Sequence, residues 1–179
     1  MITYILAAIA GILILIADQF TKYFVPNYYS ANNLSMGQDW FSFIPGILNI
    51  NYIHNDGAAW GMFSGHTWLL LSITLVVMLV CIALLLKYGV EDKLMFWAMC
   101  LVLSGGLGNM IDRIFREGKV IDFLQFDFWR DFPIFNIADC AIVIGAGLLL
   151  VYFFKGIIDD EKQKRNAAIA ELSKKNENI

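Results

Sequence analysis

The stretch WLLLSITLVVMLVCIALLL, from Trp68 to Leu86, decides the fold class because it contains no charged residue. An uncharged apolar stretch of about 18 or more residues is typical of a transmembrane helix. Three further apolar runs occupy about residues 2–25, 94–113 and 137–155. We therefore predict an all-α integral membrane protein with four transmembrane helices in one domain, residues 1–158.

The composition supports this prediction and excludes a soluble globule. Of 179 residues, 59% are hydrophobic and only 16% are charged, and the mean hydropathy is +0.62. Soluble domains contain roughly 25% charged residues. The net charge of -3 gives no reason to expect nucleic acid as a partner. The three cysteines are scattered within apolar runs and the two histidines have no partners at ligand spacing, so we expect no disulfide, metal or cofactor.

The distribution of Lys and Arg predicts how the chain crosses the membrane, because these residues accumulate on the cytoplasmic side. None occurs between Tyr23 and Thr67, whereas Lys87 and Lys93 flank the short middle loop. The charged tail, residues 159–179, is also rich in Lys and Arg. We therefore expect both termini in the cytoplasm and two extracytoplasmic loops, residues 26–67 and 114–136. The second loop departs from the rule, since it contains Arg116, Lys119 and Arg130.

The first extracytoplasmic loop is more than a linker. The end of the stretch from Trp40 to Ile53 alternates apolar and polar residues, which is typical of a half-buried strand. We expect a small sheet that lies on the membrane surface, with aromatic residues at the interface.

Polar residues near the ends of the apolar runs are the first functional candidates, because ionisable groups inside spans are costly. Three groups have helical spacing, and the predicted topology places all of them at the extracytoplasmic end. They are Asp18 with Lys22, Asn109 with Asp112 and Arg113, and Asn136 with Asp139.

Each group also has an ordinary structural explanation. Asp18 and Lys22 could form a helix-end ion pair with Lys22 reaching for the interface. Asn136 and Asp139 could form a capping box, and Gly105 and Gly108 could serve helix packing. These explanations leave out Asp122, whose neighbours on both sides are apolar and which needs a partner or a raised pKa.

Carboxylates are the economical choice for hydrolytic chemistry in this chain. No Ser, Cys or Thr has a His base in a recognisable pattern, and no HExxH motif occurs. Two carboxyl groups that share one proton can activate water and protonate a carbonyl oxygen. Asp122 and Asp139 are the best candidates. We expect Asp139, at a helix N-terminus, to be the anion and Asp122 to carry the proton.

Five motifs in order resemble those of lipoprotein signal peptidase (signal peptidase II). Any one is weak, but five in order within a four-span chain are specific. They are Asp18-Gln19-Phe20-Thr21-Lys22, Asn55-Asp56-Gly57-Ala58-Ala59-Trp60, Gly105-Gly106-Leu107-Gly108-Asn109-Met110-Ile111-Asp112-Arg113, Val120-Ile121-Asp122-Phe123 and Phe135-Asn136-Ile137-Ala138-Asp139.

The resemblance implies an aspartic endopeptidase of the bacterial inner membrane that cuts diacylglyceryl prolipoproteins before the lipidated Cys. Asp122 and Asp139 would be catalytic, in a site at the extracytoplasmic face beneath a β-cradle, and residues Gly57 to Phe63 would form a mobile helix over it. One chain would suffice, as a monomer among membrane lipids whose headgroups could meet Arg116 and Lys119. The residues that would shape the site or hold substrate are Asp18, Lys22, Asn55, Gly57, Ala58, Gly105, Gly108, Asn109, Asp112, Arg113, Asn136 and Ala138.

Two other classes of protein remain open at this point. Intramembrane carboxylates also suit a small transporter or proton channel, although such sites usually lie at the midplane between repeats. A non-catalytic membrane adaptor could use the same polar residues to hold helices together.

Overall fold

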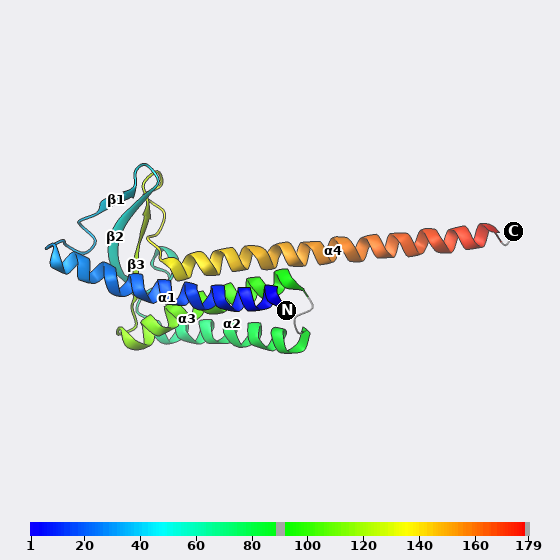
Figure 1. The fold of residues 1–179 in the computed structure, drawn as a ribbon, viewed down its shortest axis with the longest axis horizontal. Coiled ribbons are helices and arrows are strands. Elements are labelled where there is room, and N and C mark those ends of the chain that lie inside the picture. The colour runs from blue at the N-terminus through cyan, green and yellow to red at the C-terminus, as the bar shows by residue number, and fades with distance from the viewer. Residues whose placement is uncertain (89–91, 178–179) are drawn as a thin grey trace.

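Four long helices dominate the computed structural model, which describes residues 1–88 and 92–177. They are α1 (Ile2–Ala31), α2 (Thr67–Tyr88), α3 (Lys93–Phe115) and α4 (Ile137–Glu177). All four are long and apolar enough to cross a membrane. They lie side by side with their axes roughly aligned (Figure 1), which confirms the predicted class of four-span membrane protein.

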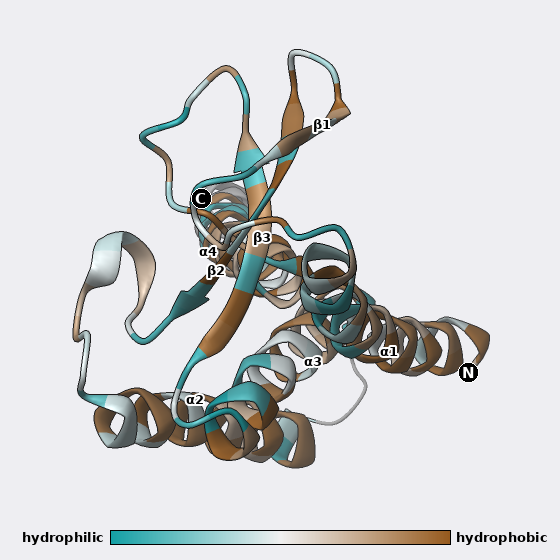
Figure 2. Ribbon diagram, turned by 90° about the vertical axis from the view of Figure 1, so that its left-hand side faces the viewer, coloured by the Kyte–Doolittle hydropathy of each residue, from teal (hydrophilic) through white to brown (hydrophobic). Residues whose placement is uncertain are grey.

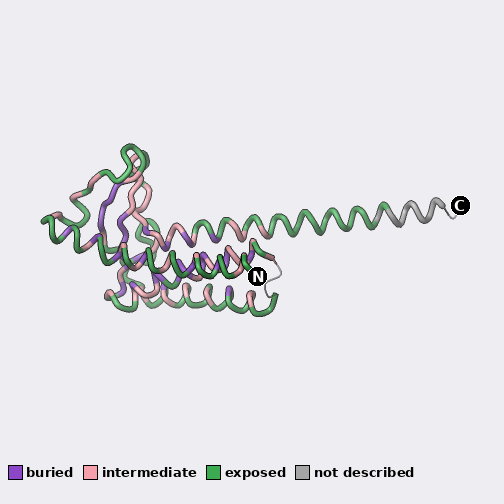
Figure 3. Tube along the Cα trace, viewed as in Figure 1, coloured by how far each residue is buried: buried purple, intermediate pink, exposed green. Residues whose placement is uncertain are grey.

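Helix α3 is the centre of the bundle. It packs extensively against α4 and α1 and less against α2, and about half of its apolar window is buried, against less than a fifth in each other helix. The outward faces of α1, α2 and α4 carry large apolar side chains that are exposed (Figure 3). Such faces are stable in hydrocarbon, where no water has to be excluded from them.

A three-stranded antiparallel sheet covers one end of the bundle, which we call the sheet end; the opposite end, from which α4 projects, is the tail end (Figures 1 and 2). The strands are β1 (Phe41–Ile44), β2 (Leu48–Asn55) and β3 (Val120–Phe126), in the order β1-β2-β3. β2 and β3 pair with a bulge between Ile50 and Ile53. The small sheet expected in the first long loop is therefore present, and it recruits a third strand from the second loop.

The sheet is anchored by an apolar core that it shares with the last turns of α1. Val25 and Tyr29 of α1 pack against Tyr52 of β2 and against Ile121 and Phe123 of β3. The Tyr29 hydroxyl donates to the carbonyl oxygens of Asp39 and Ile50 at 2.8 and 3.1 Å. This core fixes β3, and with it Asp122, relative to the helices.

The structure adds two features to the spans and loops expected from the sequence. Helix α1 does not end near residue 25 but continues through Pro26 to Ala31. The burial of Val25 and Tyr29 beneath the sheet holds these turns helical despite the proline. Residues 114–136 were expected to be a loop, but they contain strand β3, whose pairing with β2 is a long-range contact that local sequence does not reveal.

The charged segment that begins at Asp159 is a direct continuation of α4. The helix runs without interruption from Ile137 to Glu177 and leaves the bundle as a single exposed rod (Figures 1 and 3). Its placement in the cytoplasm stays a prediction.

Candidate active site

Two carboxylates from different elements face the same cavity at the sheet end. Asp122 lies on β3 and is 2% exposed. Its Oδ1 accepts a hydrogen bond from Asn136 Nδ2 at 2.6 Å, and its Oδ2 accepts one from Asn55 Nδ2 at 2.8 Å. Strand β2 supplies Asn55, and the start of α4 supplies Asn136. Three segments distant in sequence thus converge on one carboxyl group.

Asp139 belongs to the first turn of α4. Its Oδ2 accepts the backbone N–H of Asn136 at 3.0 Å, and its own backbone N–H donates to Asn136 Oδ1 at 2.9 Å. This reciprocal pair is the capping box predicted from the spacing. The other oxygen, Oδ1, accepts from Asn109 Nδ2 at 2.8 Å. Asn136 therefore contacts both candidate carboxylates.

The environment raises the pKa of Asp122 from 3.8 to about 7. Burial is the larger cause, since a charged carboxylate loses its hydration there, and the negative charge of Asp139 is the next. The hydrogen bonds from Asn55 and Asn136 act in the opposite direction. A buried carboxyl that keeps its proton near neutral pH is typical of a general acid.

A fully buried ion cluster lies directly behind the two carboxylates. The ammonium group of Lys22 contacts Asp18 Oδ2 at 2.9 Å, Asp112 Oδ2 at 3.0 Å and Asn109 Oδ1 at 2.9 Å. Lys22 is 0% exposed, so the alternative in which it reaches for the interface is wrong. All three ammonium donors have acceptors.

The cluster holds in place the two segments that carry the candidate carboxylates. Asp18 Oδ1 accepts the backbone N–H of Ala138 at 2.9 Å, next to Asp139. Asp112 Oδ2 accepts the backbone N–H of Ile121 at 3.2 Å, next to Asp122. The ion cluster thus acts on the site through the backbone.

Two glycines of α3 permit these contacts. A Cβ atom at Gly108 would lie 2.6 Å from Asp18 Oδ2, and one at Gly105 would collide with the carbonyl oxygen of Ala138. Both helix packing and site geometry therefore require a hydrogen atom at these positions.

Arg113 fastens the loop that follows β2. Its Nη2 donates to the carbonyl oxygen of Gly57 at 2.9 Å, while the Gly57 N–H donates to Asn55 Oδ1 at 2.9 Å. A short 3-10 helix, Ala59–Gly61, follows. This segment is the predicted helix near Gly57 to Phe63. Arg113 Nε is buried and has no hydrogen-bond partner among the described residues.

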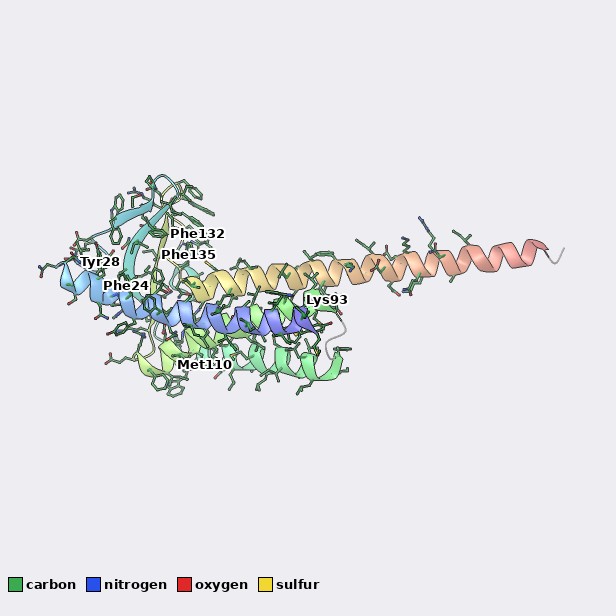
Figure 4. The ribbon with its side chains drawn as sticks, in the orientation of Figure 1. Phe24, Tyr28, Lys93, Met110, Phe132 and Phe135 are labelled. Atoms are coloured by element: carbon green, nitrogen blue, oxygen red, sulfur yellow. The ribbon has the colours of Figure 1, made fainter. Side chains whose placement is uncertain are left out.

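The cavity between these elements has a volume of about 480 Å³. One end is polar, and the rest is lined by apolar side chains of α4 and of the segment that follows β3. Phe132 and Phe135 of that segment lie beside the sheet (Figure 4), and the Trp60 ring contacts Phe132 edge-on at 5.9 Å. Of the residues predicted from sequence, those that line the cavity are Asn55, Gly57, Ala58, Asn109, Arg113, Asp122 and Asp139.

The remaining predicted residues lie behind this layer. All of them are buried and none lines the cavity, so they contact the site only through the residues in front of them. They are Asp18, Lys22, Gly105, Gly108, Asp112, Asn136 and Ala138.

Two supporting residues were missed by sequence reasoning. Gln19 Nε2 contacts Asp18 Oδ2, the Gly108 carbonyl oxygen and Asp112 Oδ1 at 3.1 to 3.3 Å. Arg116 Nε contacts Asp112 Oδ1 at 3.3 Å. This side chain therefore has a partner within the protein, besides the contact with lipid headgroups expected from the sequence. The available signals were the position of Gln19 beside Asp18 and the four-residue spacing of Asp112 and Arg116.

Fold and site together define a multi-pass membrane protein with a pair of carboxylates in one cavity at one end of its helix bundle, of which Asp122 is buried and Asp139 is half-buried. The profile of the family described as "Signal peptidase (SPase) II" matches residues 10–155. Proteins named "Lipoprotein signal peptidase" from Listeria welshimeri and Bacillus pumilus are each 39% identical, over 82% and 83% of this chain and 90% of theirs. That from Anoxybacillus flavithermus is 37% identical over 92% of this chain and 90% of its own.

Solved structures agree with this assignment. Two structures described as a bacterial membrane enzyme, solved by the in meso method, superpose with TM-scores of 0.70 and 0.71 at 37% identity. They cover 86% of this chain, and 88% and 93% of their own. The chain therefore belongs to the signal peptidase II family, which is a family of peptidases.

Proposed function

We propose that this protein is a membrane aspartic endopeptidase that removes signal peptides from diacylglyceryl-modified prolipoproteins. It cleaves on the N-terminal side of the lipidated Cys. The names of its relatives support the substrate class. The observation that carries the proposal is the pair Asp122 and Asp139, which line one cavity and share Asn136 as a hydrogen-bond partner.

In the proposed reaction, Asp139 accepts a proton from a water molecule while Asp122 donates its proton to the scissile carbonyl oxygen. The water oxygen attacks the carbonyl carbon to give a tetrahedral intermediate. The nitrogen of the lipidated Cys then takes the proton from Asp139, the C–N bond breaks, and a hydroxyl group of the intermediate returns a proton to Asp122 as the carboxylic acid forms. The helix N-terminus favours the anion at Asp139, and the raised pKa of Asp122 keeps its proton available. The titration belongs to the pair rather than to either residue.

Arg113 is proposed to hold the substrate backbone. Its Nη2 fastens the Gly57 carbonyl oxygen, and its buried Nε has no acceptor within the described residues. Because an unpaired buried donor is costly, a substrate carbonyl oxygen at this position would gain a full hydrogen bond. The apolar lining beyond it suits the hydrocarbon part of a lipid-modified peptide.

The topology completes the proposal. Both termini lie in the cytoplasm, and the sheet end with its active site lies at the extracytoplasmic face of the bacterial inner membrane. One chain contains the whole site, so the enzyme works as a monomer and needs no metal or organic cofactor.

The test is cleavage of a purified diacylglyceryl prolipoprotein in detergent by wild type and by Asp122→Asn and Asp139→Asn. We expect wild type to cut before the lipidated Cys and each variant to lose at least about 100-fold in kcat, the lower range for general acid–base catalysis. Asp131→Asn is the matched control, because Asp131 is exposed and lies outside the cavity lining; it should cleave like wild type.

Other outcomes favour other functions. Proton flux through wild-type protein in liposomes, without cleavage, would support a transporter. Full biological function of Asp122→Asn would support an adaptor. Full cleavage activity in either Asn variant would move the search for the catalytic pair to Asp18 and Asp112.

A further inference from the structure

A second, larger hollow lies on the membrane-facing side of the bundle, away from the active-site cavity. Helices α2 and α4 flank α3 without substantial packing against each other, and the groove between them has a volume of about 970 Å³. Val77 and Val80 of α2 form one wall and Leu149 and Phe153 of α4 the other. Met95 and Met99 of α3 form the floor.

The groove and the active-site cavity share no lining residue, but both lie along α4. α4 lines the cavity with Asp139 to Ile144 and lines the groove from Leu149 to Asp160. A helix rises 1.5 Å per residue, so the distance along α4 from Asp139 to Asp159 is about 30 Å. This is the thickness of the hydrocarbon core of a bilayer. A substrate helix that follows α4 from the active-site cavity through the groove would therefore cross the membrane with one end at the carboxylate pair.

The tail end of the groove is acidic. Asp92, Asp159 and Asp160 line it, against the single cation Lys155. Asp92 accepts hydrogen bonds from the first turn of α3, and Asp160 pairs with Lys164 on the exposed helix surface. Asp159 has no hydrogen bond or ion pair with the residues that the structure describes. Its carboxylate is available to a partner.

We propose that this groove holds the apolar helix of the substrate signal peptide, with the basic segment of the peptide at Asp159 and Asp160. Secretory signal peptides consist of a positively charged N-terminal region, an apolar region and a cleavage site, in that order. The groove and the active-site cavity together present acidic, apolar and catalytic elements in the same order from the tail end to the sheet end. This inference rests on the proposed function, and it adds a binding surface and a charge contact to it.

The first experiment asks what occupies the groove. A photo-crosslinking residue replaces Val80, which lines the groove and is 52% exposed, or Leu79, which is 55% exposed but does not line it. With an uncleaved prolipoprotein bound to Asp122→Asn protein, position 80 should crosslink to the apolar region of the signal peptide and position 79 should not. Equal crosslinking at both positions, crosslinking to lipid alone, or crosslinking to a second copy of this chain would overturn the proposal.

The second experiment tests the charge contact by kinetics. The double variant Asp159→Lys/Asp160→Lys should raise KM about 3- to 10-fold, the range for two exposed ion pairs, and leave kcat unchanged. With a prolipoprotein whose N-terminal lysines are replaced by glutamates, the effect should reverse: KM should be lower for the double variant than for wild type. Asp159→Lys alone should also raise KM, and Glu161→Lys is its matched control: it makes the same change of charge at a residue outside the groove lining and should keep the wild-type KM.

The two proposals fail differently. If wild type cleaves no authentic substrate, the proposed function is wrong. If wild type cleaves, but KM does not change with the charges at residues 159 and 160 or with those of the substrate, the proposed function stands and the charge contact is wrong.

Discussion

At the scale of single residues, the stability of the site depends on the partners of the buried ammonium group of Lys22. Removing a charge from water costs several kcal/mol unless partners compensate for it. Asp18, Asp112 and Asn109 occupy all three ammonium donors at 2.9 to 3.0 Å. The arrangement is stable only as a whole, because each partner lost leaves an uncompensated buried charge.

Replacement of Lys22 by Met should therefore destabilise the protein strongly. We expect a loss of about 3–5 kcal/mol, the range for breaking a buried ion pair by removing one partner, visible as a lowered Tm in detergent. The triple variant Lys22→Met/Asp18→Asn/Asp112→Asn should recover part of that loss, since no buried charge is then left unpaired. A Tm for Lys22→Met equal to that of wild type would contradict the role of the cluster.

The pKa of Asp122 predicts how activity depends on pH. Because the pKa is raised to about 7, Asp122 keeps its proton below that pH and loses it above. The specificity constant kcat/KM should therefore fall roughly tenfold per pH unit above this pKa. Asn55→Ala removes a hydrogen bond that lowers this pKa, so its alkaline limb should move to higher pH. An alkaline limb that stays in place or moves down would contradict the assignment of Asp122 as the acid.

The same pKa predicts how stability depends on pH. The folded protein holds a proton on Asp122 up to pH of about 7, whereas the unfolded chain releases it near 3.8. The stabilisation from this proton is complete below about pH 4 and is lost as pH rises through 7. Asp122→Asn cannot ionise, so its Tm relative to wild type should increase between pH 4 and 8. A flat difference for Asp122→Asn would count against the raised pKa.

The sequence allowed the principal site residues to be predicted, because their spacing and the topology place them at one depth. It could not show that Asn136 contacts both Asp122 and Asp139, since that contact depends on how β3 meets α4. Nor could it separate cavity-lining residues from supporting ones. Asp112 and Arg113 are neighbours in sequence, yet one is fully buried in the ion cluster and the other reaches Gly57.

At the scale of secondary-structure elements, the helices followed from composition and the sheet only in part. A span is a local property, because about 20 apolar residues suffice to define it. Strand β3 is not local: it forms against β2, which is some 70 residues away along the chain, as in the pairing of Ile53 with Asp122. The extension of α1 past Pro26 likewise depends on the sheet that covers Tyr29.

The contact between α3 and α4 gives a prediction at this scale. Gly105→Ala and Gly108→Ala should each destabilise the protein and reduce cleavage, because the added methyl group meets Ala138 or Asp18. Overpacking of this kind typically costs about 1–3 kcal/mol. Gly147→Ala in α4 is the matched control: no atom lies within 4 Å of the added Cβ, so stability should be unchanged or slightly higher. Equal Tm values for all three variants would contradict the tight contact.

At the scale of the whole molecule, the protein is organised from α3 outward. Its most buried helix carries Asn109, Asp112 and Arg113, and the other three helices expose apolar faces. The polar site residues come from β2, β3 and the parts of α1, α3 and α4 that contact them, which agrees with a site at one membrane face rather than at the midplane. The sequence predicted that these residues gather at one end of the bundle. The location of that end at the extracytoplasmic face stays a prediction.

The orientation can be tested with reporters at the C-terminus. A green fluorescent protein fused after the last residue should fluoresce, and alkaline phosphatase at the same place should be inactive, because we expect the tail in the cytoplasm. A phosphatase inserted after Gly46, in the turn between β1 and β2, should be active. The reverse pattern would place the sheet end in the cytoplasm.

The buried ion cluster also has a consequence for biogenesis. Asp18 and Lys22 lie one turn apart on α1 and neutralise each other as soon as that helix forms. Asp112 contacts Lys22 of α1 at 3.0 Å and Arg116, at the end of its own helix, at 3.3 Å, so part of the compensation for its charge is present only once α1 is in the membrane. The ribosome makes α1 first. If a rearranged gene encoded α3 ahead of α1, Asp112 would reach the insertion machinery without Lys22. The yield of membrane-integrated protein should then fall, whatever the effect on catalysis.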